Sequence, residues 1–549
     1  MRSKELAKRT SMSRRQPKAN YWQDAPMPRE QLVLFTTTLE DRIPADHPVR
    51  ILDEILERMD WTDWESKYHG KLGKPPIHPS VLCKVLLYAL TRRVRSSRAI
   101  EYQLKHSIDF MWLTSGRTID HVTLSNFRRE HHEQLRNIYT QMIKLAVELG
   151  VAKLSELCID GTRVLANANR FKTWTAERVA QLMKDLDAQI GQAFSALETA
   201  DELDDLLDDG QSADQLPPEL SDMQARRAQL DALLQKLNTM DAERKANGID
   251  PKKNPAQLPK TDGDSRILPN KTGGYAPNYT PMAVTECVSG FIVWPEVLIG
   301  NVEHQSMTTA IDTIELQYST KVETMMGDTA YSTGQNLTDM EARGTELLSP
   351  VAGVRAPDNP ALREDLTQPV AAEDLDRLPI NPQTKRFDKS AFVYDAEHDL
   401  YYCPAGKPLP RSGTEQTRAR GTTPAGTQAN YTCYDCAECP LGARCRVDVE
   451  AKKGRKVGRD EHESARARQR DRMNKPESKE RYRRRQHIGE TPFAALKSAL
   501  DFRQFLLRSI EGVQVEWAWG CAAFNMKKLI NLWATLRALQ IEKLEMTMN

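Results

Sequence analysis

The sequence lacks any long apolar run: nowhere in its 549 residues do about 18 apolar residues follow one another, the length that a membrane-spanning helix needs. It also lacks a hydrophobic segment near its start, where the residues are basic and polar and do not resemble a secretory signal. These absences argue against a helical membrane protein and a secreted one. They predict a cytoplasmic protein that has no membrane partner.

Net charge is nearly absent as well, at +1 for 77 basic and 76 acidic residues. The balance conceals three segments of opposite sign. Residues 1–20 hold seven Lys or Arg and one acid, residues 198–222 hold ten acids and no base, and residues 451–485 hold fifteen Lys or Arg and six acids. Basic segments of this density are typical of phosphate-binding proteins, although an unstructured tail or a solvated helix face has the same composition.

The periodicity of the apolar residues changes along the chain. Spacings of three and four residues predict an all-α region over 44–150, and alternation then predicts strands. The expected strands and the helix among them cover 153–160, 279–288, 290–299, 321–328, 333–344 (the helix) and 345–351. Long amphipathic helices are expected over 491–507 and 515–539. Strands interrupted by helices predict an α/β core.

The length gives material for roughly three to four domains, and two segments are expected to interrupt the core. One has helical apolar spacing around the acidic stretch, and the other is rich in Pro, Gly and polar residues and holds five of the nine cysteines. The predicted division is a basic tail (1–43), a helical domain (44–150), a core in two parts (151–172 and 259–350), a helical acidic insertion (173–258), a Cys-rich insertion (351–450), and a basic linker with C-terminal helices that complete the core (451–549).

Two carboxylates follow apolar strands in the same way. Asp160 ends one strand before a glycine, and Asp328 ends another 168 positions later. Strands of one sheet bring their ends together, and paired carboxylates with room for water are the ligands that Mg²⁺ prefers. Glu490, expected on a helix, would complete the set. Each acid alone is equally typical of a cap or a turn, so both interpretations remain open at this point.

Several long blocks resemble bacterial insertion-sequence transposases of the DDE type, in the IS1182-like group of the IS4/IS5 assemblage. The blocks are similar in sequence and in order over nearly the whole chain. Four lie in the helical domain, one surrounds each of the three acids, and one follows the last acid. They cover residues 44–56, 77–90, 96–113, 118–131, 158–170, 327–337, 476–497 and 511–529.

The resemblance implies an RNase H-like catalytic core with Asp160, Asp328 and Glu490 as catalytic residues and ligands of Mg²⁺ or Mn²⁺. Two such ions would serve an in-line displacement at phosphorus. The implied partners are the DNA ends of the element and target DNA, with a homodimer or higher oligomer on DNA in the nucleoid. Two alternatives remain: a DNA-binding protein derived from a transposase that has lost catalysis, and an RNase H-like nuclease acting on other nucleic acid.

The chain departs from the family pattern around the last acid, which in relatives reads Y-x₂-R-x₃-E-x₆-K. Tyr482 and Arg485 are present and Lys497 has the expected spacing. One additional residue, however, separates Arg485 from Glu490, and on a helix this turns their side chains about 140° apart. Arg483 and Lys497 lie seven residues to either side of Glu490 and share its face. We therefore expect these two to contact DNA phosphates, and the role of Arg485 as a further DNA-binding residue is in question.

The helical region also carries arginines that are candidates for contacts with a DNA backbone, although exposed arginines are common on helices. They are Arg92, Arg93, Arg95, Arg98, Arg128 and Arg129.

The Cys-rich insertion contains two overlapping C-x₂-C pairs and a further cysteine six residues on, a spacing typical of a structural Zn²⁺ site. The resemblance leaves Cys433 spare and favours four ligands, namely Cys403, Cys436, Cys439 and Cys445. The alternative is a set of reduced thiols without a metal, and disulfides are not expected in the cytoplasm.

Overall fold

The computed structural model describes residues 38–68, 75–204, 218–270, 273–351, 358–417, 426–448 and 454–548. The predicted basic tail lies outside these ranges up to residue 37. Within them, no helix is both long enough and apolar enough to cross a membrane.

The N-terminal region is helical, as predicted. α1 and α3 both begin at a proline, Pro48 and Pro79, because the first helical residue needs no N–H donor. The preceding histidines cap these helices by accepting a backbone hydrogen bond on the ring. The helices are α1 (Pro48–Glu57), α2 (Thr62–Ser66), α3 (Pro79–Thr91), α4 (Ser97–His106), α5 (Ile108–Leu113), α6 (His121–Glu130) and α7 (His132–Glu148).

A seven-stranded mixed sheet forms the centre of the molecule, in the order β2-β6-β1-β8-β9, with β5 and β7 also paired to β6. β1 is parallel to β8, and β8 to β9, whereas β6 is antiparallel to β1 and β7. The strands are β1 (Glu156–Gly161), β2 (Val164–Leu165), β5 (Arg266–Pro269), β6 (Tyr275–Glu286), β7 (Ile292–Leu298), β8 (Thr324–Met326) and β9 (Glu346–Leu348). The mixed sheet and the helical region agree with the predicted α/β class.

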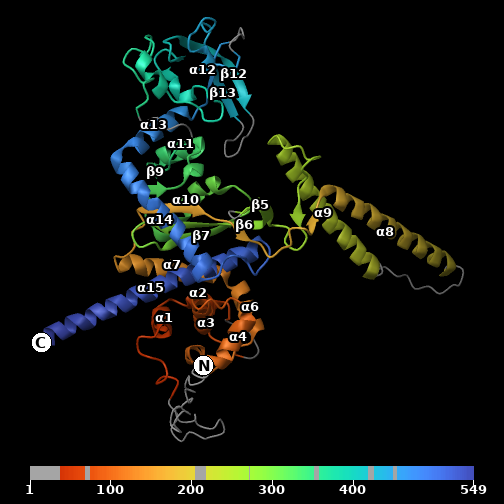
Figure 1. Ribbon diagram of the computed structural model, residues 1–549. Helices are drawn as coiled ribbons and strands as arrows, with labels where there is room; N and C mark the ends of the chain where they lie inside the picture. Colours follow the sequence, from red (N-terminus) through yellow and green to blue (C-terminus); the bar gives the residue numbers. More distant parts are fainter. Residues whose placement is uncertain are drawn as a thin grey trace, which may run out of the picture.

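The last helix, α15 (Ile510–Met548), joins the two regions. It packs against β7 on one side and against α3 and α7 on the other, and Figure 1 shows it running between the sheet and the N-terminal helices. Trp517 is buried there and donates its indole N–H to the carbonyl of Met282 at 2.9 Å. One hydrophobic core therefore extends from the N-terminal helices through the sheet.

The helix that we expected over residues 491–507 ends early. α14 (Pro476–Ala499) stops at Ala499, and the chain turns back toward the end of β2. Leu165 exchanges two backbone hydrogen bonds with this segment, at 3.2 and 2.9 Å, and Phe502 and Phe505 are completely buried. The apolar residues of the segment are thus buried in a turn and an irregular stretch rather than along a helix face, which explains why their spacing misled the prediction.

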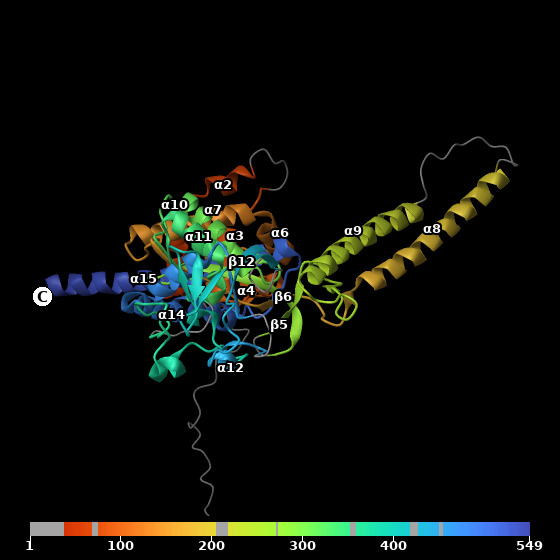
Figure 2. The same ribbon diagram turned by 90° about the horizontal axis from the view of Figure 1, so that it is seen from above.

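The acidic insertion is a hairpin of two long helices, α8 (Ala176–Asp204) and α9 (Pro218–Ala246), as its apolar spacing indicates. The helices pack against each other, and Arg227 pairs with Asp187 between them at 3.0 Å. A two-stranded sheet of β3 (Thr173–Trp174) and β4 (Leu258–Pro259) closes the base of the hairpin. Figure 2 shows the hairpin projecting away from the rest of the molecule.

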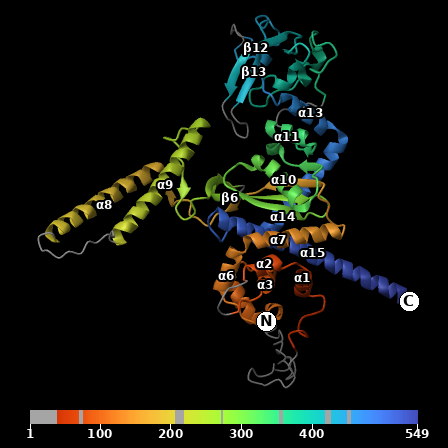
Figure 3. The same cartoon turned by 180° about the vertical axis from the view of Figure 1, so that it is seen from behind.

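The Cys-rich segment forms a separate module with its own small core. Its five-stranded antiparallel sheet has the order β10-β11-β12-β13-β14. The strands are β10 (Val393–Asp395), β11 (Leu400–Tyr402), β12 (Pro408–Thr417), β13 (Gly426–Thr432) and β14 (Lys456–Arg459), with the short helices η3 (Ala372–Arg377), η4 (Lys389–Ala391) and α12 (Gly442–Cys445). β14 lies beyond the range 351–450, so the module takes its last strand from the basic linker. Figure 3 shows the module at the opposite end of the molecule from the N-terminal helices.

Candidate active site

The two aspartates lie at the same edge of the sheet. β1 and β8 are parallel neighbours, and their register pairs Glu156 with Thr324 and Cys158 with Met326. Each pair differs by 168 positions, the same offset that separates Asp160 from Asp328. β8 ends at Met326. If its register with β1 continues for two more residues, Asp160 and Asp328 lie opposite each other, with backbones about 4.8 Å apart.

Both carboxylates are anchored by local hydrogen bonds. Asp160 Oδ1 accepts the N–H of Gly161 at 2.8 Å, and Asp328 Oδ1 accepts the N–H of Ala330 at 2.9 Å at the start of η2 (Thr329–Tyr331). Asp160 Oδ2 pairs with the guanidinium of Arg485 at 3.0 Å, and the two side chains are only 14 and 12% exposed. The most buried ion pair of the edge thus joins the first acid to α14.

α14 runs along β1 and reaches both ends of the strand. Arg481 holds it at the opposite edge of the sheet through ion pairs to Glu156 at 2.9 Å and Glu346 at 2.6 Å. The helix from Arg481 to Gly489 spans roughly 12 Å. The strand from Glu156 to Asp160 spans roughly 13 Å. Helix and strand therefore advance together, and Gly489 arrives beside Asp160.

Gly489 is the closest approach of α14 to the first acid. A Cβ added at this glycine would lie 3.3 Å from Asp160 Oδ2 and 3.1 Å from the sulfur of Cys158. The space between the helix and the strand at this point is therefore tight. Glu490 follows directly and is exposed. Within the described residues, no group of three or more His, Cys, Asp or Glu side chains is arranged to hold a metal ion.

Tyr331 and Glu303 belong to this edge and were missed at the level of sequence. Tyr331 is 2% exposed, and among the described residues its hydroxyl has no hydrogen-bond partner. Burial raises its pKa well above the usual value, and the charges of Asp160, Glu303 and Asp328 raise it further. The buried phenol therefore lies within electrostatic reach of three carboxylates. The signal was present, since Tyr331 lies in the block around Asp328.

Glu303 is in the short helix η1 (Glu303–Ser306) and closes the other side of the loop after β1. It pairs with Arg163 at 2.6 Å, and a Cβ added at Gly161 would lie 3.2 Å from its Cγ. The same Cβ would lie still closer, at 2.7 Å, to the sulfur of Met282, so a side chain at position 161 would require Met282 and Glu303 to move.

The three predicted DNA-binding residues differ in their surroundings. The Lys497 ammonium donates to the hydroxyl of Thr162 at 2.6 Å and to the carbonyl of Arg163 at 2.8 Å. Arg483 is 79% exposed and pairs with Glu480 at 3.1 Å. Arg485 does lie on another face than Glu490, but that face is turned to Asp160. Arg485 and Gly489 are four residues apart and therefore lie on the same face of α14. Both are next to Asp160.

The basic stretch is largely paired within the protein. It forms α13 (Glu463–Asn474), where Arg466 pairs with Asp460 at 2.6 Å and with Glu463 at 3.0 Å. Arg468 pairs with Glu341 at 2.6 Å on the neighbouring α11 (Gly334–Arg343). These ion pairs hold α13 in place. The positive charge of α13 that is left for a phosphate is therefore smaller than its composition indicates.

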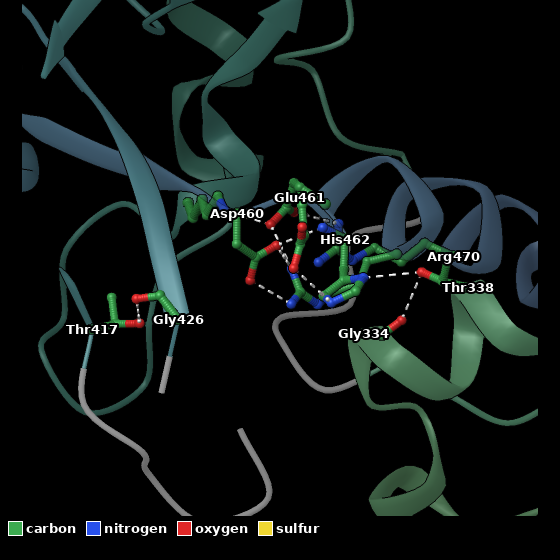
Figure 4. A network of polar contacts seen from close by, with 11 residues as sticks. Gly334, Thr338, Thr417, Gly426, Asp460, Glu461, His462 and Arg470 are labelled. Carbon is green, nitrogen blue, oxygen red and sulfur yellow. Dashed lines mark hydrogen bonds and ion pairs between the residues drawn. The ribbon is translucent and has the colours of Figure 1, made fainter. Parts of the chain in front are cut away.

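His462 forms the joint between this stretch and the chain after Asp328. Figure 4 shows it between Asp460 and Thr338, and its Nδ1 is 2.9 Å from the Thr338 hydroxyl. A Cβ added at Gly334 would lie 2.5 Å from the His462 Cβ, so these two segments of the chain are in direct contact. The Cys-rich module is thereby connected to the helix that follows the second acid.

Two of the arginines predicted to contact DNA in the helical region are buried, and for them the prediction was wrong. Arg95 is 7% exposed and pairs with Glu516 of α15 at 2.6 Å. Arg128 is 8% exposed and donates to the carbonyl of Arg95 at 3.2 Å. Buried acceptors, not phosphates, satisfy these guanidinium groups. The helical spacing around Arg95 could not predict its pairing with Glu516, which lies more than 400 positions away in the sequence.

All five cysteines of the insertion line one small cavity of about 20 Å³. A hydrogen bond from the Cys433 thiol lowers the pKa of Cys403 to about 6, whereas burial raises that of Cys445 to about 12. The overlapping C-x₂-C pairs and the distant Cys403 do converge. Cys433, expected to be spare, lies in the same cluster.

Comparison with known families decides what kind of protein carries these sites. Residues 402–530 match the family described as Transposase DDE domain, and residues 37–130 match the one described as Transposase domain (DUF772). The chain therefore carries a transposase DDE domain. The first transposase match includes the cysteines, α13, α14 and most of the described part of α15, and the second covers α1 to α6. No curated protein matches the chain.

Proposed function

We propose that this chain is a divalent-metal-dependent DNA transposase of the IS1182-like group, which cleaves the ends of its own insertion sequence and transfers the 3′-hydroxyl ends to target DNA. The observation that supports the proposal is the parallel register of β1 and β8, which when continued by two residues pairs Asp160 with Asp328, together with the close approach of Gly489, the neighbour of Glu490, to Asp160. The transposase matches at both ends of the chain support the same activity.

The types of residue at this edge are those that a hard divalent cation takes, although the three carboxylates are not gathered into one group in the described structure. Carboxylates from β1, β8 and α14 are the donors that Mg²⁺ or Mn²⁺ takes, and the unpartnered hydroxyl of Tyr331 is a donor left for a ligand-bound water. Asp160, Asp328 and Glu490 would hold the ions, which would supply Lewis acidity at the attacking and leaving oxygens of an in-line displacement.

The protein's own side chains prepare this edge. Arg485 neutralises Asp160 and keeps the two carboxylates from repelling each other across adjacent strands. Lys497 fixes the loop that follows Asp160. Arg483, on the exposed side of α14, is placed to contact a phosphate close to Glu490.

The activity is tested with purified protein and linear DNA that carries the ends of the encoding element. We expect Mg²⁺ or Mn²⁺ to produce cleavage at the element ends and joining of their 3′-hydroxyls to a second DNA, and EDTA to abolish both. Sequencing of the junctions is the measurement. Cleavage without joining would favour the nuclease alternative, and tight binding of the ends without cleavage would favour the catalytically inactive one.

Lys497→Ala is expected to slow end cleavage roughly 10- to 100-fold, as is usual when a residue that orients a metal-binding group is lost. DNA affinity should change little, because the ammonium is bonded to Thr162 and Arg163. Lys479→Ala, an exposed lysine of the same helix, is the matched control. A loss of affinity equal to the loss of rate would instead make Lys497 a phosphate contact.

We further propose that the cysteine cluster holds one structural Zn²⁺. Four thiolates in a closed site are the usual ligands of such an ion. The support is the convergence of Cys403, Cys433, Cys436, Cys439 and Cys445 on one small cavity. Cys403, Cys436, Cys439 and Cys445 remain the proposed ligands.

Purified protein is expected to contain about one tightly bound zinc per chain, measured by elemental analysis. Cys436→Ser and Cys439→Ser should each release the metal and make residues 400–448 sensitive to proteolysis. Cys287→Ser, a half-buried cysteine outside the cluster, should retain it. A full zinc content in Cys436→Ser and its loss in Cys433→Ser would exchange these two residues in the ligand set.

A further inference from the structure

A cleft of about 670 Å³ lies between the helical region and the sheet, and none of the candidate active-site residues lines it. Its walls come from α6, α7, β7, α10 (Met307–Tyr318) and the start of α15. Binding sites occur preferentially at such junctions between domains, and this volume is typical of a site for a compact ligand.

The cleft has an apolar floor and a basic rim. The floor includes Leu135, Val293 and Val515, of which the first two are completely buried. Three exposed arginines stand on the rim, namely Arg129, Arg136 and Arg508. A ligand that complements both would combine apolar side chains with negative charges.

The rim arginines are available for such a ligand. Arg129 donates to the amide oxygen of Asn126 at 2.9 Å, and Arg508 donates to the carbonyl of Asn167 at 3.2 Å. Within the described ranges, none of the three arginines forms an ion pair with a carboxylate. Two acids line the cleft as well, namely Glu296, which is bonded to Gln514 at 2.8 Å, and the exposed Glu511. Arg128 also lines the cleft, so four arginines outnumber two carboxylates and the cleft keeps a net positive charge.

One segment of the chain has the complementary composition. Residues 205–217, here called the acidic tip, connect α8 to α9 and contain four aspartates, three leucines and no basic residue. We propose that the acidic tip of one copy of the chain binds in this cleft of a second copy, with leucines on the apolar floor and aspartates against the arginine rim.

The direction of the hairpin favours the cleft of another copy. α8 has 29 residues, so its C-terminal end lies roughly 43 Å from the base of the hairpin. Figure 2 shows both helices directed away from the core. Each copy offers one tip and one cleft, so two copies can satisfy each other about a two-fold axis.

A DNA duplex fits the same cleft less well. Its phosphates would meet the arginines, but its polar backbone would cover apolar residues such as Leu135 and Val293. DNA would also leave the ten acids of residues 198–222 without a partner. The proposal is independent of the catalytic residues, because its test measures assembly rather than cleavage.

The test uses the full-length protein in analytical ultracentrifugation over a concentration series. We expect a dimer whose dissociation constant rises at least about tenfold in two charge-reversed variants. One changes the rim (Arg129→Glu with Arg136→Glu) and the other the tip (Asp208→Lys with Asp209→Lys). Arg98→Glu with Arg117→Glu, on exposed positions of the helical region outside the cleft, is the matched control and should dimerise normally.

The decisive sample is an equimolar mixture of the two variants. In a mixed dimer, each reversed tip meets a reversed rim and each original tip meets an original rim, so dimers should return to the wild-type level. A wild-type chain that stays monomeric, a mixture that stays monomeric, or a rim variant that still dimerises would each overturn the proposal. A rim variant that dimerises normally but loses DNA affinity would assign the cleft to DNA.

Discussion

Asp160→Asn and Asp328→Asn are each expected to reduce metal-dependent end cleavage about a thousandfold or more, equivalent to roughly 4 kcal/mol of activation free energy. Each change removes the negative charge that attracts the cation and keeps the shape of the side chain. The two residues should have similar effects because the register of β1 and β8 makes them equivalent members of one edge. The measurement is single-turnover cleavage of labelled end DNA in Mg²⁺.

Three comparisons make this result specific. Asp339→Asn changes an aspartate of α11 that is bonded only to Gln335, and it should cleave normally. End-DNA affinity and the thermal unfolding temperature should stay near the wild-type values in both active-site variants. Normal cleavage by either variant would remove that residue from the active site.

Arg95→Met is expected to lower the free energy of unfolding by roughly 3 to 5 kcal/mol, the usual effect of leaving one partner of a buried ion pair without its counter-charge. Arg95 and Glu516 are 7 and 4% exposed in their side chains. The guanidinium also donates to the carbonyl of Gln504 at 2.7 Å and lies 4.3 Å from the ring centroid of Phe502. The pair joins α15 to the helical region, so the whole shared core should lose stability.

Denaturant unfolding followed by tryptophan fluorescence measures this loss, since Trp517 lies in the same core. Arg92→Met, an exposed arginine nearby, should change the stability by less than about 0.5 kcal/mol. The double variant Arg95→Met with Glu516→Met should recover part of the loss, because the isolated buried charge is gone. Equal losses in Arg92→Met and Arg95→Met would show that the ion pair contributes nothing particular.

Local patterns predicted the elements of the fold well. Spacings of three and four residues predicted the helical region correctly, and alternating apolar residues indicated β6, β7 and β8 correctly. The failures concern long-range partners. Nothing local to Phe502 and Phe505 shows that they would be buried in a non-helical segment bonded to the end of β2. The sequence around Arg95 likewise predicts an exposed side chain. The structure buries it because Glu516, far away in the sequence, pairs with it.

The candidate site shows the same limit. The sequence predicted Asp160, Asp328 and Glu490 as a site, and it correctly predicted that Glu490 lies on a helix. Tyr331 lay in the block around Asp328 but was not singled out, and the sequence gave no reason to include Glu303. The Arg485 side chain could be assigned to a face of α14, but not to Asp160, since the direction of the helix along β1 comes from the ion pairs of Arg481 at the other edge.

Under the proposed function, the position of α14 along β1 also sets the time during synthesis at which a chain could first cleave DNA. Asp160 and Asp328 leave the ribosome early, and Glu490 follows 162 residues after Asp328, about 8 to 32 s later at usual rates of translation. Until then β1 lacks the helix that brings Glu490 to its edge. A truncated or stalled product therefore has two of the proposed catalytic acids without the third, so under the proposed function only nearly finished molecules would cleave DNA.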